Sequence, residues 1–291
     1  MAVMSNPERL TDRAVIRIAG DERKTFLQGL ITQDIDALSP DAPIFAALLT
    51  PQGKILFDFL IHEDGDALLV DGCAQAAPAL SKRLALYKLR ADVTIEPAAD
   101  LGVFAHDAPF AVDGAEAAPD PRHPGLGWRL VAPAKGDAGA DGGAYEARRL
   151  AVGAPEFGKD FDGGEMFPMD VNYDALAGVS YRKGCFVGQE VASRMKRKGE
   201  VRKRTLLAAL DGPAPQRGAP VTAGASTLGE ILSAETMENH ANGKGTADAS
   251  KSRALALIRL DRWDKARAAG EMSVVNGAEA VLSFPDYLEQ D

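Results

Sequence analysis

One of the two cysteines, Cys185, lies in a segment whose residue types suit thiol chemistry. Lys183 precedes it, Gly184 and Gly188 lie on either side of it, and a strongly basic segment follows. Cations and a helix N-terminus favour a thiolate, and the residues after Gly188 are typical of a helix start. The segment therefore predicts an open, reactive thiol. The alternative is a small buried hydrophobic residue, which is the ordinary role of a lone cysteine.

A carboxylate in an apolar strand is the second candidate for chemistry. Asp58 interrupts the run Ile55–Leu60, and alternation places it on the same face as Leu56 and Leu60. It either faces water or faces a pocket, where it would accept hydrogen bonds from an amine or a guanidine-like edge. A third segment, Met166–Tyr173, mixes Met, Phe and Tyr with Asp and Asn, which suits a flat aromatic ligand or a plain packed loop.

Composition excludes several classes of protein. The 291 residues are 46% hydrophobic and 26% charged, as in an ordinary chain of two or three modest domains. Two cysteines do not make a disulfide framework or supply the four thiolates of an iron–sulfur cluster, and the four histidines lack zinc spacing. Residues 1–10 lack the apolar run of a secretory signal, and no run is long enough to span a membrane. We therefore expect a cytoplasmic protein with no membrane contact and no tightly held metal.

The net charge of −9 is unevenly distributed. Residues 182–204 carry a local charge of +7, since only Glu190 and Glu200 oppose nine cations: Arg182, Lys183, Arg194, Lys196, Arg197, Lys198, Arg202, Lys203 and Arg204. Because the rest of the chain is acidic, the charge distribution argues against general nucleic-acid binding. This basic stripe fits a small anionic ligand or a local docking site, or it is a solvated helix face.

Hydrophobic patterning predicts an α+β region followed by a small β-domain. Residues 44–50 and 55–62 form a hairpin around a Pro-Gln-Gly-Lys turn, and residues 74–89 form a helix. Residues 153–180 lack a period, so we expect them to line a site rather than to form a core. Short strands after residue 203 predict a small all-β module, either a barrel or a sandwich. We expect an α+β region over 1–200, in two parts near 1–100 and 101–200, and a C-terminal β-barrel over 201–291.

The segment Lys183–Glu190, KGCFVGQE, resembles the signature of the YgfZ proteins, in which an aromatic or aliphatic residue follows K-G-C and precedes x-G-Q-E. These proteins are folate-binding relatives of the glycine-cleavage T-protein GcvT and are implicated in maturing iron–sulfur enzymes. The likeness extends over nearly the whole chain, through residues 26–34, 53–58, 148–156, 172–180 and 254–259.

The resemblance implies a ring-like assembly in which the two-part GcvT/YgfZ-type region and the barrel enclose a folate pocket. It implies a tetrahydrofolate cofactor, or a one-carbon derivative, with Asp58 and Asn172 near the pterin and Cys185 as a functional thiol. The basic stripe would meet the anionic glutamate tail of the folate. The loop residues that would lie beside the pocket are Lys183, Gly184, Gly188, Gln189, Glu190 and Arg194.

The function implied is that of an accessory factor for assembly or repair of iron–sulfur clusters, with assembly proteins and client enzymes as partners. The alternative is a folate-dependent aminomethyltransferase in which Asp58 positions or activates an amine. The transferases place two adjacent acids in the hairpin strand and lack the cysteine, whereas here Phe57 precedes Asp58. This departure favours the assembly factor over the enzyme. A third class, a module that docks protein or RNA through the basic stripe, is the least favoured.

Overall fold

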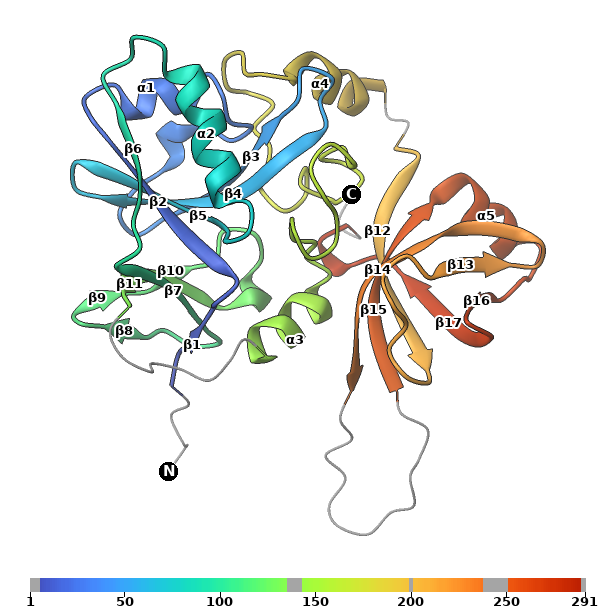
Figure 1. Cartoon of the computed structure of the whole chain (residues 1–291). Helices are drawn as coiled ribbons and strands as arrows, with labels where there is room; N and C mark the ends of the chain where they lie inside the picture. Colours follow the sequence, from blue (N-terminus) through green and yellow to red (C-terminus); the bar gives the residue numbers. More distant parts are fainter. Residues whose placement is uncertain (1–5, 135–142, 199–200, 238–250, 289–291) are drawn as a thin grey trace.

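The computed structural model describes residues 6–134, 143–198, 201–237 and 251–288. It consists of two β-sheet units packed together, an irregular segment, and a barrel at the C-terminal end (Figure 1). The fold is α+β, with a two-part N-terminal region and a small C-terminal barrel, as the sequence predicts. Among the described residues, no helix is long and apolar enough to cross a membrane.

The first unit is a five-stranded antiparallel sheet in the order β3-β4-β5-β2-β6. Its face toward the helices is apolar, with Ile16, Phe59 and Val70 packed against Leu80 and Leu84. The predicted hairpin is β3–β4, and the predicted helix is α2. The elements are β2 (Arg13–Ala19), α1 (Arg23–Gln28), η1 (Ile35–Ala37), β3 (Ile44–Leu49), β4 (Ile55–Asp64), β5 (Ala67–Cys73), α2 (Ala77–Lys88) and β6 (Thr94–Pro97).

The second unit is a four-stranded sheet in the order β1-β7-β11-β10, which packs against the other face of the first sheet. Val15 and Leu69 from the first sheet meet Val103 and Ala105 from the second. A helix, α3, follows the last strand. The elements are β1 (Glu8–Arg9), β7 (Leu101–His106), β8 (Ala111–Val112), β9 (Ala115–Glu116), β10 (Ala118–Pro119), η2 (Pro124–Leu126), β11 (Trp128–Pro133) and α3 (Gly143–Val152).

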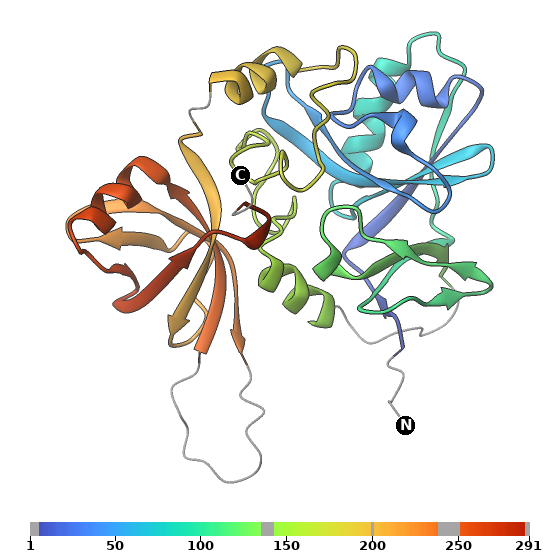
Figure 2. The same cartoon turned by 180° about the vertical axis from the view of Figure 1, so that it is seen from behind.

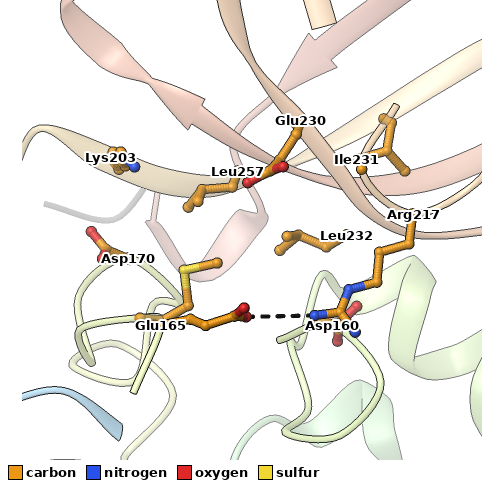
Figure 3. Close-up of a pocket in the computed structure, with 11 residues that line it drawn as sticks. Asp160, Glu165, Asp170, Lys203, Arg217, Glu230, Ile231, Leu232 and Leu257 are labelled. Carbon is orange, nitrogen blue, oxygen red and sulfur yellow. Dashed lines mark ion pairs between the residues drawn. The ribbon is translucent and has the colours of Figure 1, made fainter. Parts of the chain in front are cut away.

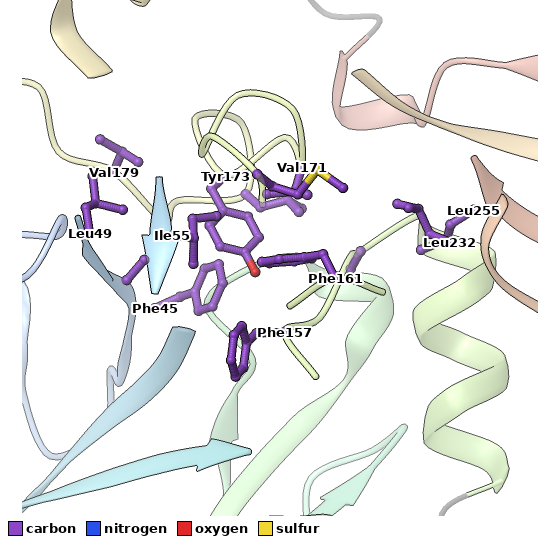
Figure 4. Close-up of a cluster of buried hydrophobic side chains, with 14 of the residues drawn as sticks. Phe45, Leu49, Ile55, Phe157, Phe161, Val171, Tyr173, Val179, Leu232 and Leu255 are labelled. Carbon is purple, nitrogen blue, oxygen red and sulfur yellow. The ribbon is translucent and has the colours of Figure 1, made fainter. Parts of the chain in front are cut away.

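Residues 153–188 have no regular secondary structure, yet they supply much of the largest apolar core. Phe157, Phe161, Val171 and Tyr173 are buried there with Phe45 (Figure 4). The expectation that residues 153–180 line a site instead of forming a core is therefore wrong for most of the segment. An irregular backbone has no fixed side-chain period, so buried positions leave no periodic signal in the sequence.

The barrel is closed by six antiparallel strands in the order β12-β15-β14-β13-β16-β17. Leu255 and Leu257 of β15 join the core around residues 153–188, so the barrel is attached by apolar packing. Seen from behind, α4 lies between the first sheet and the start of β12 (Figure 2). The elements are α4 (Gln189–Lys198), β12 (Lys203–Asp211), β13 (Pro220–Ala223), β14 (Ser226–Met237), β15 (Lys251–Arg259), α5 (Leu260–Ala268), β16 (Ser273–Val275), β17 (Ala278–Ser283) and η3 (Asp286–Leu288).

Candidate functional site

Cys185 is exposed on the loop that leads into α4. The residue two positions before it, Lys183, is buried and points into the protein instead. Its ammonium group donates hydrogen bonds of 2.8 Å to the carbonyl oxygens of Gln28, Ile31 and Gln33. Burial lowers the pKa of Lys183 to about 8, so the ammonium form still dominates at pH 7. Lys183 therefore fastens the cysteine loop to the segment between α1 and η1.

A close backbone contact holds the other side of the loop. Gly188 has a φ of +80°, and a Cβ built there would lie 2.5 Å from the carbonyl oxygen of Thr50. Gly53, at the tip of the β3–β4 hairpin, likewise lies against Val191 of α4. Only glycine accommodates this conformation and this contact at position 188. The cysteine is thus presented by a loop fixed at both ends.

The remaining residues of the loop divide into an inner and an outer set. Phe186 is buried in the core, whereas Gly184 is exposed and has no atom within 4 Å of an added Cβ. Gln189 begins α4, the helix expected after the motif. Glu190 and Arg194 form an exposed ion pair of 2.6 Å. Of the basic stripe, the side chains that reach the surface near this helix are Arg182, Arg194, Lys196 and Arg197, and the side chain of Lys198 lies outside the described residues.

Asp58 is 2% exposed and faces the interior, as strand alternation allows. Its carboxylate accepts a hydrogen bond of 3.0 Å from the backbone N–H of Phe157 and another from the hydroxyl of Tyr173. The rings of Phe45 and Phe161 pack against Tyr173 (Figure 4). Burial raises the pKa of Asp58, an effect that the nearby Arg13 partly opposes. In this structure Asp58 fastens the irregular segment to β4.

Asn172 is fully buried and has a φ of +61°. Its side-chain N–H groups donate to the carbonyl of Thr205 at 2.8 Å and to the hydroxyl of Tyr287 at 3.1 Å. Tyr287 in turn donates to the carbonyl of Gly153 at 2.5 Å. The side-chain oxygen of Asn172 has no partner among the described residues. Asn172 therefore connects the irregular segment, the barrel and the C-terminal turn.

A buried ionic network lies between the two sheets, and sequence reasoning missed it. Asp71 accepts from Arg13 at 2.7 Å and from Arg129 at 2.6 Å. Burial opposes ionisation of Asp71, but the two guanidinium groups outweigh it and hold the pKa of Asp71 at about 2. The network continues through Glu156 and Tyr145. The members of this network are far apart in sequence, so no short motif marks it. The only signal in the sequence is the presence of charged residues inside apolar strands.

A cavity of about 650 Å³ lies between the irregular segment and the barrel (Figure 3). Met166 and Asp170, from the segment expected to suit a flat ligand, line it. Burial raises the pKa of Asp170. Arg217 pairs with Glu165 at 3.6 Å at one side of the cavity. Apolar walls and charges of both signs come from the barrel, through Lys203, Glu230, Ile231, Leu232 and Leu257.

Three comparisons relate this chain to known proteins. A family model for the C-terminal β-barrel domain of CAF17 matches residues 202–290. The human mitochondrial iron–sulfur cluster assembly factor IBA57 is 31% identical over 96% of this chain and 84% of its own length. The mouse protein of the same name is 32% identical over 72% of this chain and 68% of its own. The chain belongs to the IBA57 family.

The IBA57-family chain also shares its fold with a glycine-cleavage enzyme. The crystal structure of aminomethyltransferase T from Bartonella henselae aligns with a TM-score of 0.66 over 98% of this chain and 87% of that one, at 14% identity. At that identity the likeness concerns the fold alone.

The comparisons correct one expectation. The names of the IBA57 relatives place them in mitochondria, so the expectation of a cytoplasmic protein is wrong. Both compartments keep thiols reduced, and the cellular address lies in targeting segments, so the composition of a folded domain cannot separate them.

Proposed function

We propose that this protein is an accessory factor for assembly or repair of iron–sulfur clusters and that Cys185 is its single ligand to the cluster. The observation that carries the proposal is an exposed thiol on a loop fixed by Lys183 and Gly188. The names of its IBA57 relatives support the same role. The KGCFVGQE segment, which resembles the YgfZ signature, adds support.

The geometry limits what the thiol does with a cluster. A two-iron cluster takes four protein ligands, and the described residues contain no group of three or more His, Cys, Asp or Glu side chains that could hold a metal ion. Cys185 would therefore contribute one ligand to a cluster whose other ligands come from a carrier or client protein. Exposed cations of the same loop and helix, Arg182 and Lys196, would attract the anionic cluster.

Replacing each cysteine in turn tests the thiol. In cells that lack the gene, wild-type protein and Cys73→Ser, the matched control at the second free cysteine, should restore the activity of iron–sulfur enzymes. Cys185→Ser should not. If Cys185→Ser fully restores the activity of the iron–sulfur enzymes, the thiol is not needed and the proposed role of Cys185 is overturned.

Tetrahydrofolate binding is the second part of the proposal, and the 650 Å³ cavity is large enough for such a ligand. Carboxylates recognise the guanidine-like edge of a pterin by paired hydrogen bonds, a role that Asp170 and Glu230 would fill. Lys203 and Arg217 would meet the carboxylates of the glutamate tail, and Leu257 would pack against the ring. A bound folate would supply a carrier for one-carbon groups.

Calorimetric titration with tetrahydrofolate under reducing conditions tests this site. Asp170→Asn and Glu230→Gln should each weaken binding about tenfold, the effect of one lost charged hydrogen bond. Asp58→Asn should lower stability and leave the affinity unchanged, because its carboxylate is bonded to Phe157 and Tyr173. If Asp58→Asn weakens binding and the other two variants do not, the pterin binds at Asp58 instead. If the wild-type protein does not bind tetrahydrofolate, folate is removed from the proposal.

The alternative function, a folate-dependent aminomethyltransferase, is less well supported. It requires Asp58 to position an amine, yet this carboxylate is 2% exposed and accepts its hydrogen bonds from its own chain. Turnover of an aminomethyl substrate with tetrahydrofolate, lost in Asp58→Asn, would reverse this preference.

A further inference from the structure

A second cavity, of about 350 Å³, lies where the two sheets meet, away from the cysteine loop and the barrel. It extends from the end of β4 to the outer edge of β11. Leu69 and Leu101 form apolar walls, and His62 and Arg129 also line it. Nothing in the proposed iron–sulfur or folate role uses this cavity.

Two buried polar atoms of this cavity have no hydrogen-bond partner among the described residues. Arg129 is 1% exposed; its Nε donates to Asp71 at 2.6 Å and its Nη1 to the hydroxyl of Tyr145 at 3.1 Å. The third nitrogen, Nη2, has no partner in the described part of the chain, and neither has Nε2 of His62. A guanidinium N–H that is buried without an acceptor is costly, so such a group calls for an acceptor from a water, an ion or a bound molecule.

At the inner end of the cavity, the described carboxylates are already engaged with other partners. Within the network, the carboxylates of Asp71, Asp120 and Glu156 are balanced by three guanidinium groups, so no carboxylate is left over for Nη2. Burial lowers the pKa of His62 to about 4, so its imidazole is neutral at pH 7. Nearby charges act in both directions: Asp71 and Asp120 raise this pKa, whereas Arg129 and Arg13 lower it. A ligand carboxylate beside both groups would supply the missing acceptor.

The outer end of the cavity has the opposite character. Two of its three carboxylates are in ion pairs, Glu63 with Lys24 at 2.6 Å and Asp64 with Arg17 at 2.8 Å. The third, Glu116, is exposed, and no ion pair is found for it among the described residues. A second carboxylate on the ligand would be repelled here, whereas an ammonium group would be attracted.

The backbone of β11 adds a donor and an acceptor. Leu10 donates to the carbonyl of Val103 at 2.9 Å, so the polar groups of Val103 face β1. Val131, which lies opposite Val103, must then direct its N–H and C=O away from β7. On that side β10 pairs with Trp128 and Arg129, and no described strand pairs with the edge at Val131, which lies beside the cavity.

We propose that this cavity binds a small zwitterion of the amino-acid class. The carboxylate of the ligand accepts from Nη2 of Arg129 and Nε2 of His62, its apolar chain packs on Leu69 and Leu101, and its ammonium group lies toward Glu116. This site is separate from the proposed cluster and folate sites, so a test of zwitterion binding here does not depend on either of those proposals.

Nuclear magnetic resonance of the imidazole nitrogens of His62 in the full chain tests the proposal. The probes are 4-aminobutyrate, butyrate and butylamine at constant ionic strength. We expect saturable shifts with 4-aminobutyrate, affinity about tenfold weaker for butyrate, no response to butylamine, and an upward shift of the pKa of His62 in the complex.

Variants separate the contributions. Glu116→Gln should bring 4-aminobutyrate and butyrate to similar affinity, and His62→Leu should weaken both, with calorimetry as the readout. Lys82→Met, at an exposed position of α2 outside both cavities, is the control that should change neither. The proposal is overturned if neither carboxylate produces saturable shifts, the outcome expected when water alone satisfies Arg129, or if His62→Leu binds both as tightly as the wild type.

Discussion

Lys183→Met is the sharpest test of how the cysteine loop is held. The substitution keeps the volume of the side chain but removes all three hydrogen bonds to the carbonyls of Gln28, Ile31 and Gln33. A bond from a charged donor contributes about 1.5–3 kcal/mol. Because the three share one ammonium group whose burial is itself unfavourable, we expect a total loss of about 2–4 kcal/mol.

Urea unfolding measures the global loss, and hydrogen exchange measures the local one. The amide of Ser180, which donates to the carbonyl of Thr32 at 2.9 Å, reports on whether the loop stays attached to the α1–η1 segment. Arg182→Met is the matched control, since this exposed neighbour has the same charge. If Lys183→Met is as stable as Arg182→Met and Ser180 exchanges equally slowly in both, the reasoning about the loop is refuted.

Three further predictions concern the loop and the interior. Gly188→Ala should destabilise the protein by at least about 1–2 kcal/mol in thermal unfolding, because its Cβ would meet the carbonyl of Thr50 at a positive φ. Gly184→Ala, with open space around the added Cβ, should leave stability unchanged. Equal losses of stability in the two variants would contradict this reasoning. Asp71→Asn should cost about 3–5 kcal/mol in urea, because it leaves Arg13 and Arg129 buried without their shared carboxylate; a loss below about 1 kcal/mol would show that the network reorganises. The pKa of His62 is about 4 in the folded chain and about 6.5 in the unfolded chain, so the unfolded chain binds more protons between pH 4 and pH 6.5. The free energy of unfolding should therefore fall by about 2–3 kcal/mol as the pH drops from 6.5 to 4. In His62→Gln, this contribution to the pH dependence of the unfolding free energy should be absent.

The sequence predicted the fold where the pattern is local and regular. The β3–β4 hairpin follows from two apolar runs around a Pro-Gly turn, and α2 follows from the helical spacing of Leu80 and Leu84. The short strands after residue 203 predicted a barrel or a sandwich, the family resemblance favoured the barrel, and α5 was missed. The irregular core was missed as well, because aromatic residues such as Phe161 follow no period there.

The sequence by itself determined the candidate thiol, the KGCFVGQE signature around it and the α+β and barrel architecture. These depend on residue types at short spacing, which the chain displays directly. Only the tertiary structure decided that Lys183 fastens the loop and that Asp58 is bonded to Tyr173. It also brought Asp170 and Glu230 into the lining of one cavity and His62 and Arg129 into the lining of another. Such pairings join residues far apart in the chain, so they exist only once burial and backbone hydrogen bonding have packed the elements together.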